Sequence, residues 1–293
     1  MLEPGSTTRQ GRLFLSLDPR DPPGGGGEAR VGLASAIDEA WLAEDFPHLW
    51  REAFVSVFDP DRDRVVTSKQ TTFAGLVIRE GIAGPQADPQ GASRALAEYL
   101  RPRAEAFFRE DKGASALISR VRFLARAMPD AGVPALDAEA LGDSLAAACE
   151  GSTTLPQVRA KGLKNLLLGA FQWPARQALE THAPEALEVP SGNRIRLEYP
   201  EDGEGPPVLA VRLQELFGLT ETPRVAGGRV PVRLHLLAPN YRPTQITDDL
   251  ASFWANTYAE VRKELRARYP KHPWPDDPLT APPKSVGGRG RHS

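Results

Sequence analysis

The chain has 293 residues, of which 41% are hydrophobic and 25% charged, with a formal net charge of −2. This balance excludes a disordered chain, and the near-neutral charge gives no general sign of a nucleic-acid partner. The single cysteine, Cys149, excludes a disulfide framework and a cysteine-based zinc site. No run of about 18 apolar residues predicts a membrane span, so we expect a cytoplasmic protein without membrane contact.

The first 82 residues are predicted to form a partial, OB-like small β-barrel. A short helix over 38–50 would turn Trp41 and Leu42 inward, and the sequence Asp59-Pro60-Asp61-Arg62-Asp63 is a strong hairpin turn. Several strands and one small helix within so short a segment favour a small barrel. The predicted strands are 13–17, 29–33, 53–58 and 64–78.

Residues 83–186 are predicted to form a helical domain, because apolar residues recur there at helical spacing. Asp137 is a plausible N-cap for one helix, and another is expected to end near Met128-Pro129. Trp173-Pro174 interrupts the last helical segment. Cys149 lies among alanines near a helix end and is expected to be a small buried hydrophobe.

Residues 187–279 are predicted to form a mixed α/β C-terminal domain, followed by a disordered tail over 280–293. The strand over 230–237 is apolar enough to be central, and Thr247 can cap a final helix. The other predicted strands are 194–199 and 208–211. The fold class expected for the whole chain is therefore α+β.

No group of residues in the sequence predicts catalysis or metal binding. The sequence Asp38-Glu39-Ala40-Trp41 resembles the magnesium-holding box of helicase motors, but no GxxxxGK[ST] phosphate loop accompanies it, so a helix start is the better interpretation. The four glycines 24–27 predict a loop. No histidine pair has metal-ligand spacing, and no HExxH or GxSxG sequence occurs. An independent hydrolase is accordingly the least favoured function.

The remaining signal is a local excess of basic residues between Arg224 and Lys271. This segment contains nine arginines and lysines and four carboxylates, which gives a local charge of +5, and aromatic residues are interspersed. Such a surface suits RNA, because cations contact phosphates and aromatic rings stack on bases. Basic residues at the end of a helix are equally favoured by the helix dipole, so a purely structural role stays open.

Several segments in a fixed order resemble a known family. They are Val189–Leu197, Pro207–Gly218, Pro223–Pro231, Phe253-Trp254 and Arg268–Pro278. Together they resemble the C-terminal domain of the HrpB-type DEAH-box ATP-dependent RNA helicases, most densely over Leu187–Leu279. Residues 13–80 resemble, more loosely, the later strands of the oligonucleotide-binding barrel that follows the motor in that family.

The resemblance implies that two motor domains would lie N-terminal to Met1, and that ATP and magnesium would bind there. We therefore expect no catalytic residue, no metal and no cofactor in this chain, and no ATP hydrolysis by it alone. The expected function is that of an accessory portion of the helicase, which binds or guides RNA or docks on motor domains supplied in cis or in trans. The alternative is a protein-interaction or structural module that binds no nucleic acid.

The predicted nucleic-acid-binding residues are eight cations and one aromatic residue. Trp274 is the aromatic residue expected to be most exposed, although its proline-rich setting also suits a rigid strap packed on the domain. The predicted phosphate contacts are Arg194, Arg196, Arg224, Arg229, Arg262, Lys263, Arg266 and Lys271.

Overall fold

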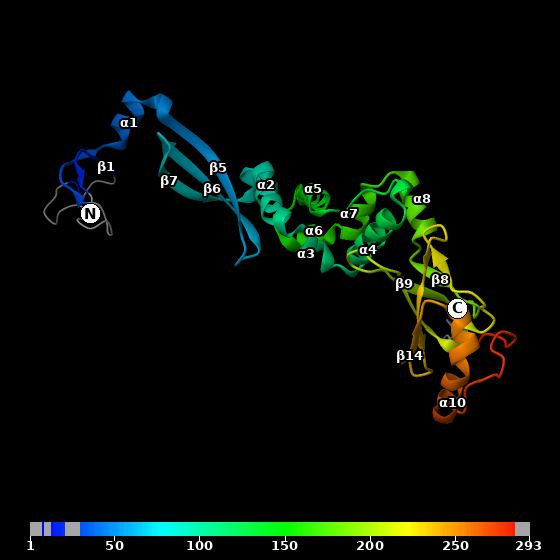
Figure 1. Cartoon of the computed structure of the whole chain (residues 1–293). Helices are drawn as coiled ribbons and strands as arrows, with labels where there is room; N and C mark the ends of the chain where they lie inside the picture. The colour runs from blue at the N-terminus through cyan, green and yellow to red at the C-terminus, as the bar shows by residue number, and fades with distance from the viewer. Residues whose placement is uncertain (1–7, 9–12, 21–29, 285–293) are drawn as a thin grey trace, which may run out of the picture. The chain divides into compact units, whose positions relative to one another are not determined.

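A computed structural model describes residue 8 and residues 13–20 and 30–284 of the chain (Figure 1). It divides into two compact units, residues 1–95 and residues 96–293, which are described separately below. The described part contains no helix with the length and apolar character that a membrane crossing requires. The predicted glycine loop at 24–27 and residues 285–293 of the tail predicted over 280–293 lie outside the described residues, whereas Lys284 is described and its N–H donates to the Gln214 carbonyl at 3.0 Å.

Unit 1 begins with two short strand pairs and one short helix. Asp38 is the N-cap of this helix, and its carboxylate accepts a hydrogen bond from the Ala40 N–H at 2.9 Å. This confirms the helix-start interpretation of that segment. The prediction that Trp41 points inward is wrong: the side chain is 59% exposed, because the helix is short and buries none of its residues. The elements are β1 (Leu13–Ser16) paired with β4 (Ala34–Ile37), β2 (Pro19–Arg20) paired with β3 (Arg30–Val31), and α1 (Glu39–Asp45).

The rest of unit 1 is a three-stranded antiparallel meander. Asp59 closes the first hairpin by accepting hydrogen bonds from the backbone N–H groups of the turn, as its sequence predicts. The strand predicted over 64–78 is divided by a second hairpin at Ala74 and Gly75, whose φ angles of 47° and 87° are those of a two-residue hairpin turn. The strands are β5 (Trp50–Asp59), β6 (Arg64–Phe73) and β7 (Leu76–Ala83).

Unit 1 buries little apolar surface. Among its described residues, the large apolar side chains that reach the buried class are Phe58 and Val65, whereas Val57 and Ile82 are 60% and 94% exposed. None of the described sheets closes into a barrel, so the OB-like prediction is not confirmed beyond a set of antiparallel strands. The coarser prediction, a chain of mixed helices and sheets, is confirmed.

A helical layer follows and contains the larger hydrophobic core. Its longest helix begins after Asp111, whose side chain accepts a hydrogen bond from the Ala114 N–H at 2.7 Å, and it ends at Ala127, before Met128-Pro129. Asp137 caps the predicted next helix. Cys149 is buried as expected, and burial raises the pKa of its thiol to about 11. The helices are α2 (Pro89–Leu100), in which the boundary between the units falls, α3 (Ala104–Arg109), α4 (Lys112–Ala127), α5 (Ala138–Cys149), α6 (Leu155–Ala160), α7 (Leu163–Gly169) and α8 (Trp173–His182).

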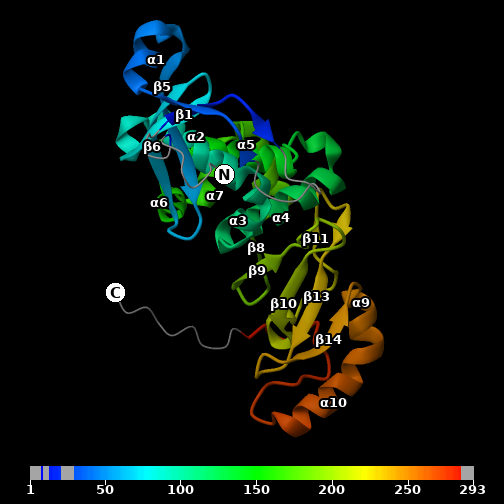
Figure 2. The same ribbon diagram turned by 90° about the vertical axis from the view of Figure 1, so that its left-hand side faces the viewer.

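A five-stranded sheet completes unit 2, in the order β14-β13-β10-β9-β8 (Figure 2). The apolar strand β13 pairs in parallel with β10 and antiparallel with β14, so the prediction of a central strand is confirmed. The edge strand β14 was not predicted. It begins at Pro243, which an edge strand tolerates because one side of the strand needs no ladder donor. The strands are β8 (Ala186–Glu188), β9 (Arg194–Glu198), β10 (Val208–Arg212), β13 (Arg233–Leu237) and β14 (Pro243–Thr247), with the small hairpin β11 (Arg224–Val225) and β12 (Val230–Pro231) between β10 and β13.

The loop between β9 and β10 packs tightly against α4 at a single glycine. Gly203 has φ of +75°, and a Cβ added to it would lie 2.7 Å from the backbone carbon of Arg122. Gly205 has φ of +90°, but nothing lies within 4 Å of the position of its Cβ. We expect Gly203→Ala to lower the free energy of unfolding by about 2–4 kcal/mol and Gly205→Ala by only about 1 kcal/mol, measured by urea unfolding. Equal losses would show that the backbone angle matters and the contact does not.

The final helix begins later than predicted. Thr247 is the last residue of β14, and Asp249 is the N-cap instead, accepting a hydrogen bond from the Ser252 N–H at 2.9 Å. Helical spacing predicts one apolar face of six residues; Leu250, Phe253, Trp254, Tyr258 and Leu265 are buried, and Val261 is half-buried. The helix consists of α9 (Leu250–Ser252), a π-helical stretch (Phe253–Thr257) and α10 (Tyr258–Arg268).

The proline-rich segment after α10 packs as a strap. The predicted exposure of Trp274 is wrong: the residue is 8% exposed, and its indole N–H donates to the carbonyl of Tyr269 at 2.8 Å. The Tyr258 hydroxyl donates to the Pro275 carbonyl at 2.8 Å, and the Gly218 N–H donates to the Pro278 carbonyl at 3.0 Å. The alternative prediction, a strap packed on the domain, is therefore confirmed.

Candidate nucleic-acid interface

The predicted phosphate-binding cations fall on three different parts of unit 2. All eight belong to this unit, but the sequence alone could not show which of them are held by carboxylates or carbonyls of the protein. The groups are Arg194 and Arg196 on β9, Arg224 and Arg229 at the β11–β12 hairpin, and Arg262, Lys263, Arg266 and Lys271 on or just after α10.

In the α10 group, cations lie side by side, and some of them have no ion-pair partner in the described part of the chain. Arg262, Lys263 and Arg266 line a shallow depression together with Ala259, Ala267 and Pro270. Arg262 is engaged: its Nε–H donates to the Trp274 carbonyl at 2.9 Å, and its guanidinium pairs with Asp276. Lys263 and Arg266 are exposed and form no ion pair within the described residues. Lys271 is also exposed and unpaired in the described chain.

Both arginines of the β11–β12 group form hydrogen bonds or ion pairs within the protein. Arg224 donates to the Gly228 carbonyl at 2.6 Å and so closes its own hairpin. Arg229 donates to the Ala127 carbonyl at the end of α4 and pairs with Asp130, both at 3.2 Å. Hydrogen bonding from Arg229 lowers the pKa of the Asp130 carboxyl. These arginines fasten the hairpin and offer less free charge than the sequence indicates.

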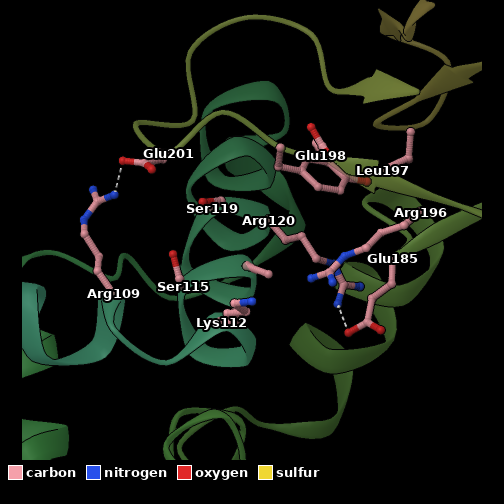
Figure 3. Close-up of a pocket in the computed structure, with 12 residues that line it drawn as sticks. Arg109, Lys112, Ser115, Ser119, Arg120, Glu185, Arg196, Leu197, Glu198 and Glu201 are labelled. Carbon is pink, nitrogen blue, oxygen red and sulfur yellow. Dashed lines mark hydrogen bonds and ion pairs between the residues drawn. The ribbon is translucent and has the colours of Figure 1, made fainter. Parts of the chain in front are cut away.

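Arg196 faces a second group of cations, which the sequence analysis missed. A pocket of ≈ 370 Å³ lies between α3, α4 and β9 (Figure 3). Its cations are Arg109, Lys112, Arg120 and Arg196, and its carboxylates are Glu185, Glu198 and Glu201. The spacing of Lys112, Ser115 and Ser119, which places them on one face of a helix, was the available signal.

Arg120 lies beside this pocket and connects elements of the fold that surround it. It is 3% exposed and donates to the Ala183 carbonyl at 2.8 Å and to the carboxylates of Glu180 and Glu185, both at 2.9 Å. Hydrogen bonding from Lys164 is the main cause of the lowered pKa of Glu185, and burial raises the pKa of Tyr199. Arg120 therefore joins α4 to the start of the sheet.

A related network makes stability depend on pH. Hydrogen bonds from Arg122 and Arg109 lower the pKa of Glu105 from 4.5 to about 2. Since the folded-state pKa is the lower one, this stabilisation is present above pH 4.5 and is lost as the pH falls toward 2. With Glu105 40% exposed, we expect Glu105→Gln to cost about 1–2 kcal/mol at pH 6 and nearly nothing at pH 2, measured by urea unfolding. The same difference at both pH values would contradict this assignment.

Comparison with known proteins identifies the region. The family model described as "ATP-dependent helicase C-terminal" (HrpB_C) matches residues 144–278. The ATP-dependent RNA helicase HrpB of Escherichia coli (strain K12) is 35% identical over 266 residues, which are 87% of this chain and 32% of that protein.

Solved structures agree with this match. A crystal structure of the E. coli DExH-box NTPase HrpB matches 97% of this chain and 35% of its own, with a TM-score of 0.66 and 30% identity. A second, of the E. coli DEAH/RHA helicase HrpB, matches 94% of this chain and 34% of its own, with a TM-score of 0.58 and 28% identity. The chain thus matches the C-terminal region of ATP-dependent helicases. In particular, it corresponds to the C-terminal region of the HrpB-type helicases and spans about a third of the length of these relatives.

No group of three or more histidine, cysteine, aspartate or glutamate side chains is placed to hold a metal ion in the part that the structure describes.

Proposed function

We propose that this chain is an RNA-contacting accessory region of an ATP-dependent RNA helicase and that α10 contacts the phosphate backbone. The matched E. coli relative is an ATP-dependent RNA helicase, and two thirds of it lie outside the match. ATP and magnesium would bind to motor domains in that further portion, in cis or in trans. The chain alone is then expected not to turn over ATP, and RNA-stimulated turnover by the purified chain would contradict this.

The observation that carries the proposal is the pair of uncompensated cations on α10. Lys263 and Arg266 lie beside Arg262 on one depression, and neither has a carboxylate partner among the described residues. Cations that a fold needs for its own stability are normally paired, as Arg229 and Arg233 are here with Asp130 and Asp248. Unpaired neighbouring cations instead attract a polyanion, with an affinity that falls as salt rises.

Charge reversal on α10 tests this contact. We expect Lys263→Glu/Arg266→Glu to weaken the binding of a fluorescein-labelled single-stranded RNA about tenfold or more, measured by anisotropy at two salt concentrations, because two phosphate contacts are lost and two repulsions gained. The salt dependence should flatten as well. The matched control is Arg64→Glu/Arg94→Glu, which changes the net charge equally at two exposed arginines of β6 and α2.

Two results would overturn the proposal. One is unchanged RNA affinity in the α10 variant, and the other is an equal loss in the control variant, which would show only an effect of net charge. Either would favour the alternative, a structural or protein-interaction module that binds no nucleic acid.

A docking role has separate support in unit 1. One face of the β5–β6–β7 sheet carries Val55, Val57, Val66 and Ile82, with Val57 opposite Val66 and with Ser68 of β6 between Val55 and Ile82. We call this set the apolar face. We propose that the motor-bearing portion of the helicase covers it, and that unit 1 forms part of an OB-like barrel in that context. Exposed apolar patches of this kind mark interaction surfaces.

A further inference from the structure

The pocket between α3, α4 and β9 contains two hydroxyls that the fold does not use. Lys112, Ser115 and Ser119 follow one face of α4, and all three line the pocket. Figure 3 shows the two serines between Arg109 and Glu201 on one side and Arg120 and Glu185 on the other. Ser119 is only 5% exposed. Neither serine hydroxyl has a hydrogen-bond partner within the described residues, in contrast to Ser144, whose hydroxyl donates to the Ala140 carbonyl at 2.9 Å.

Neither hydroxyl is among the fully buried polar atoms without a partner, so both are open to the pocket that they line. Both serine hydroxyls can donate and accept. Their placement in the pocket therefore leaves both hydroxyls available to a polar ligand.

The charges around the serines indicate the chemistry of that ligand. Arg109 is shared between Glu105 and Glu201, and Arg120 between Glu180 and Glu185. Lys112 and Arg196 are exposed and form no ion pair within the described chain. They are cations available to an anionic group, next to hydroxyls that can donate to its oxygens. Glu198, which also lines the pocket, is an acceptor for a ligand hydroxyl.

We propose that this pocket holds one ribonucleotide unit of a bound RNA strand, an inference that rests on the proposed RNA-contacting function. The phosphodiester lies against Lys112 and Arg196, and the ribose hydroxyl exchanges hydrogen bonds with Ser115, Ser119 and Glu198. The cavity of ≈ 370 Å³ lies within the range of ligand pockets. Because only RNA carries a 2′-hydroxyl, the serines confer a preference for RNA over DNA.

The test uses the full chain and labelled single-stranded RNA and DNA of the same sequence. We expect Lys112→Gln/Arg196→Gln to weaken RNA binding about five- to tenfold and to reduce its salt dependence, since two phosphate contacts are lost. Ser115→Ala/Ser119→Ala should weaken RNA binding about threefold while leaving DNA binding unchanged. Thermal melting of each variant confirms that it is folded. The exposed Lys69→Gln/Arg64→Gln variant in β6 is matched in charge to the first.

The outcomes separate this inference from the proposed function. Loss of RNA binding in the α10 variant without any change in the pocket variants would overturn the pocket assignment and leave the proposed function in place. No change in either set would overturn both. Unlabelled AMP distinguishes a strand from a free nucleotide: saturable AMP binding that the pocket variants abolish, with unchanged RNA binding, would overturn the assignment to a strand. Equal losses for RNA and DNA in the serine variant would overturn the role of the ribose hydroxyl.

Discussion

Replacing Glu215 with alanine is expected to lower the free energy of unfolding by about 3–5 kcal/mol, because it removes the carboxylate that pairs with the buried guanidinium of Arg212. The two side chains are only 5% and 6% exposed, and Arg212 donates to the Glu215 Oε1 through Nε and Nη2, both at 3.1 Å. The other carboxylate oxygen accepts from the Ser191 hydroxyl at 3.0 Å and from the Asn193 amide at 2.6 Å. The substitution therefore breaks four hydrogen bonds.

The measurement is urea unfolding followed by circular dichroism. Glu264→Ala is the control, because its ion pair with Arg268 on α10 is exposed at both ends and is expected to contribute no more than about 0.5 kcal/mol. Arg212→Met/Glu215→Leu removes both charges, and we expect it to cost clearly less than Glu215→Ala. A loss below about 1 kcal/mol in the single variant would show that water or backbone groups satisfy Arg212 without Glu215.

This network also shows what the sequence could predict of the fold. Pro190 and Gly192 favour a turn at Ser191, but nothing local shows that the Ser191 hydroxyl reaches a carboxylate 24 residues away. Local signals of that kind also found Asp137 as an N-cap and the end of α4 at Met128-Pro129. Elements that depend on distant partners, such as the edge strand β14, could not be predicted from the local sequence.

The candidate interface was only partly predictable for the same reason. The basic residues were correctly seen as an excess, but Arg229 is paired with Asp130, which lies 99 residues earlier. Arg233 on β13 is paired with Asp248, which directly follows the neighbouring strand β14. Which cations stay free is a property of the fold, and the structure reduces the α10 group to Lys263, Arg266 and Lys271. The proline-rich sequence around Trp274 was compatible with an exposed and with a packed side chain. The hydrogen bond to the Tyr269 carbonyl shows that the side chain is packed.

The other large effect is expected at the apolar face of unit 1. We expect Val57→Lys/Ile82→Lys to weaken association with the motor-bearing portion of the helicase by more than about 100-fold, because two unpaired ammonium groups would have to be buried in an apolar contact. Both side chains are mostly exposed in this chain, at 60% and 94%, so the substitutions leave its own folding unchanged. The measurement is calorimetric titration of this chain with the part of E. coli HrpB that it does not match.

The control separates surface chemistry from charge. Gln86→Lys/Gln90→Lys adds the same two charges at exposed polar positions of unit 1, and it should leave the affinity within about twofold. If the Val57→Lys/Ile82→Lys variant and the control both bind with the wild-type affinity, the apolar face stays uncovered in the complex. Because β5 and β7 contribute to this face from opposite edges of the sheet, the single variants Val57→Lys and Ile82→Lys locate the contact. A loss confined to one of them places the covering surface over that edge, whereas comparable losses place it across the whole sheet.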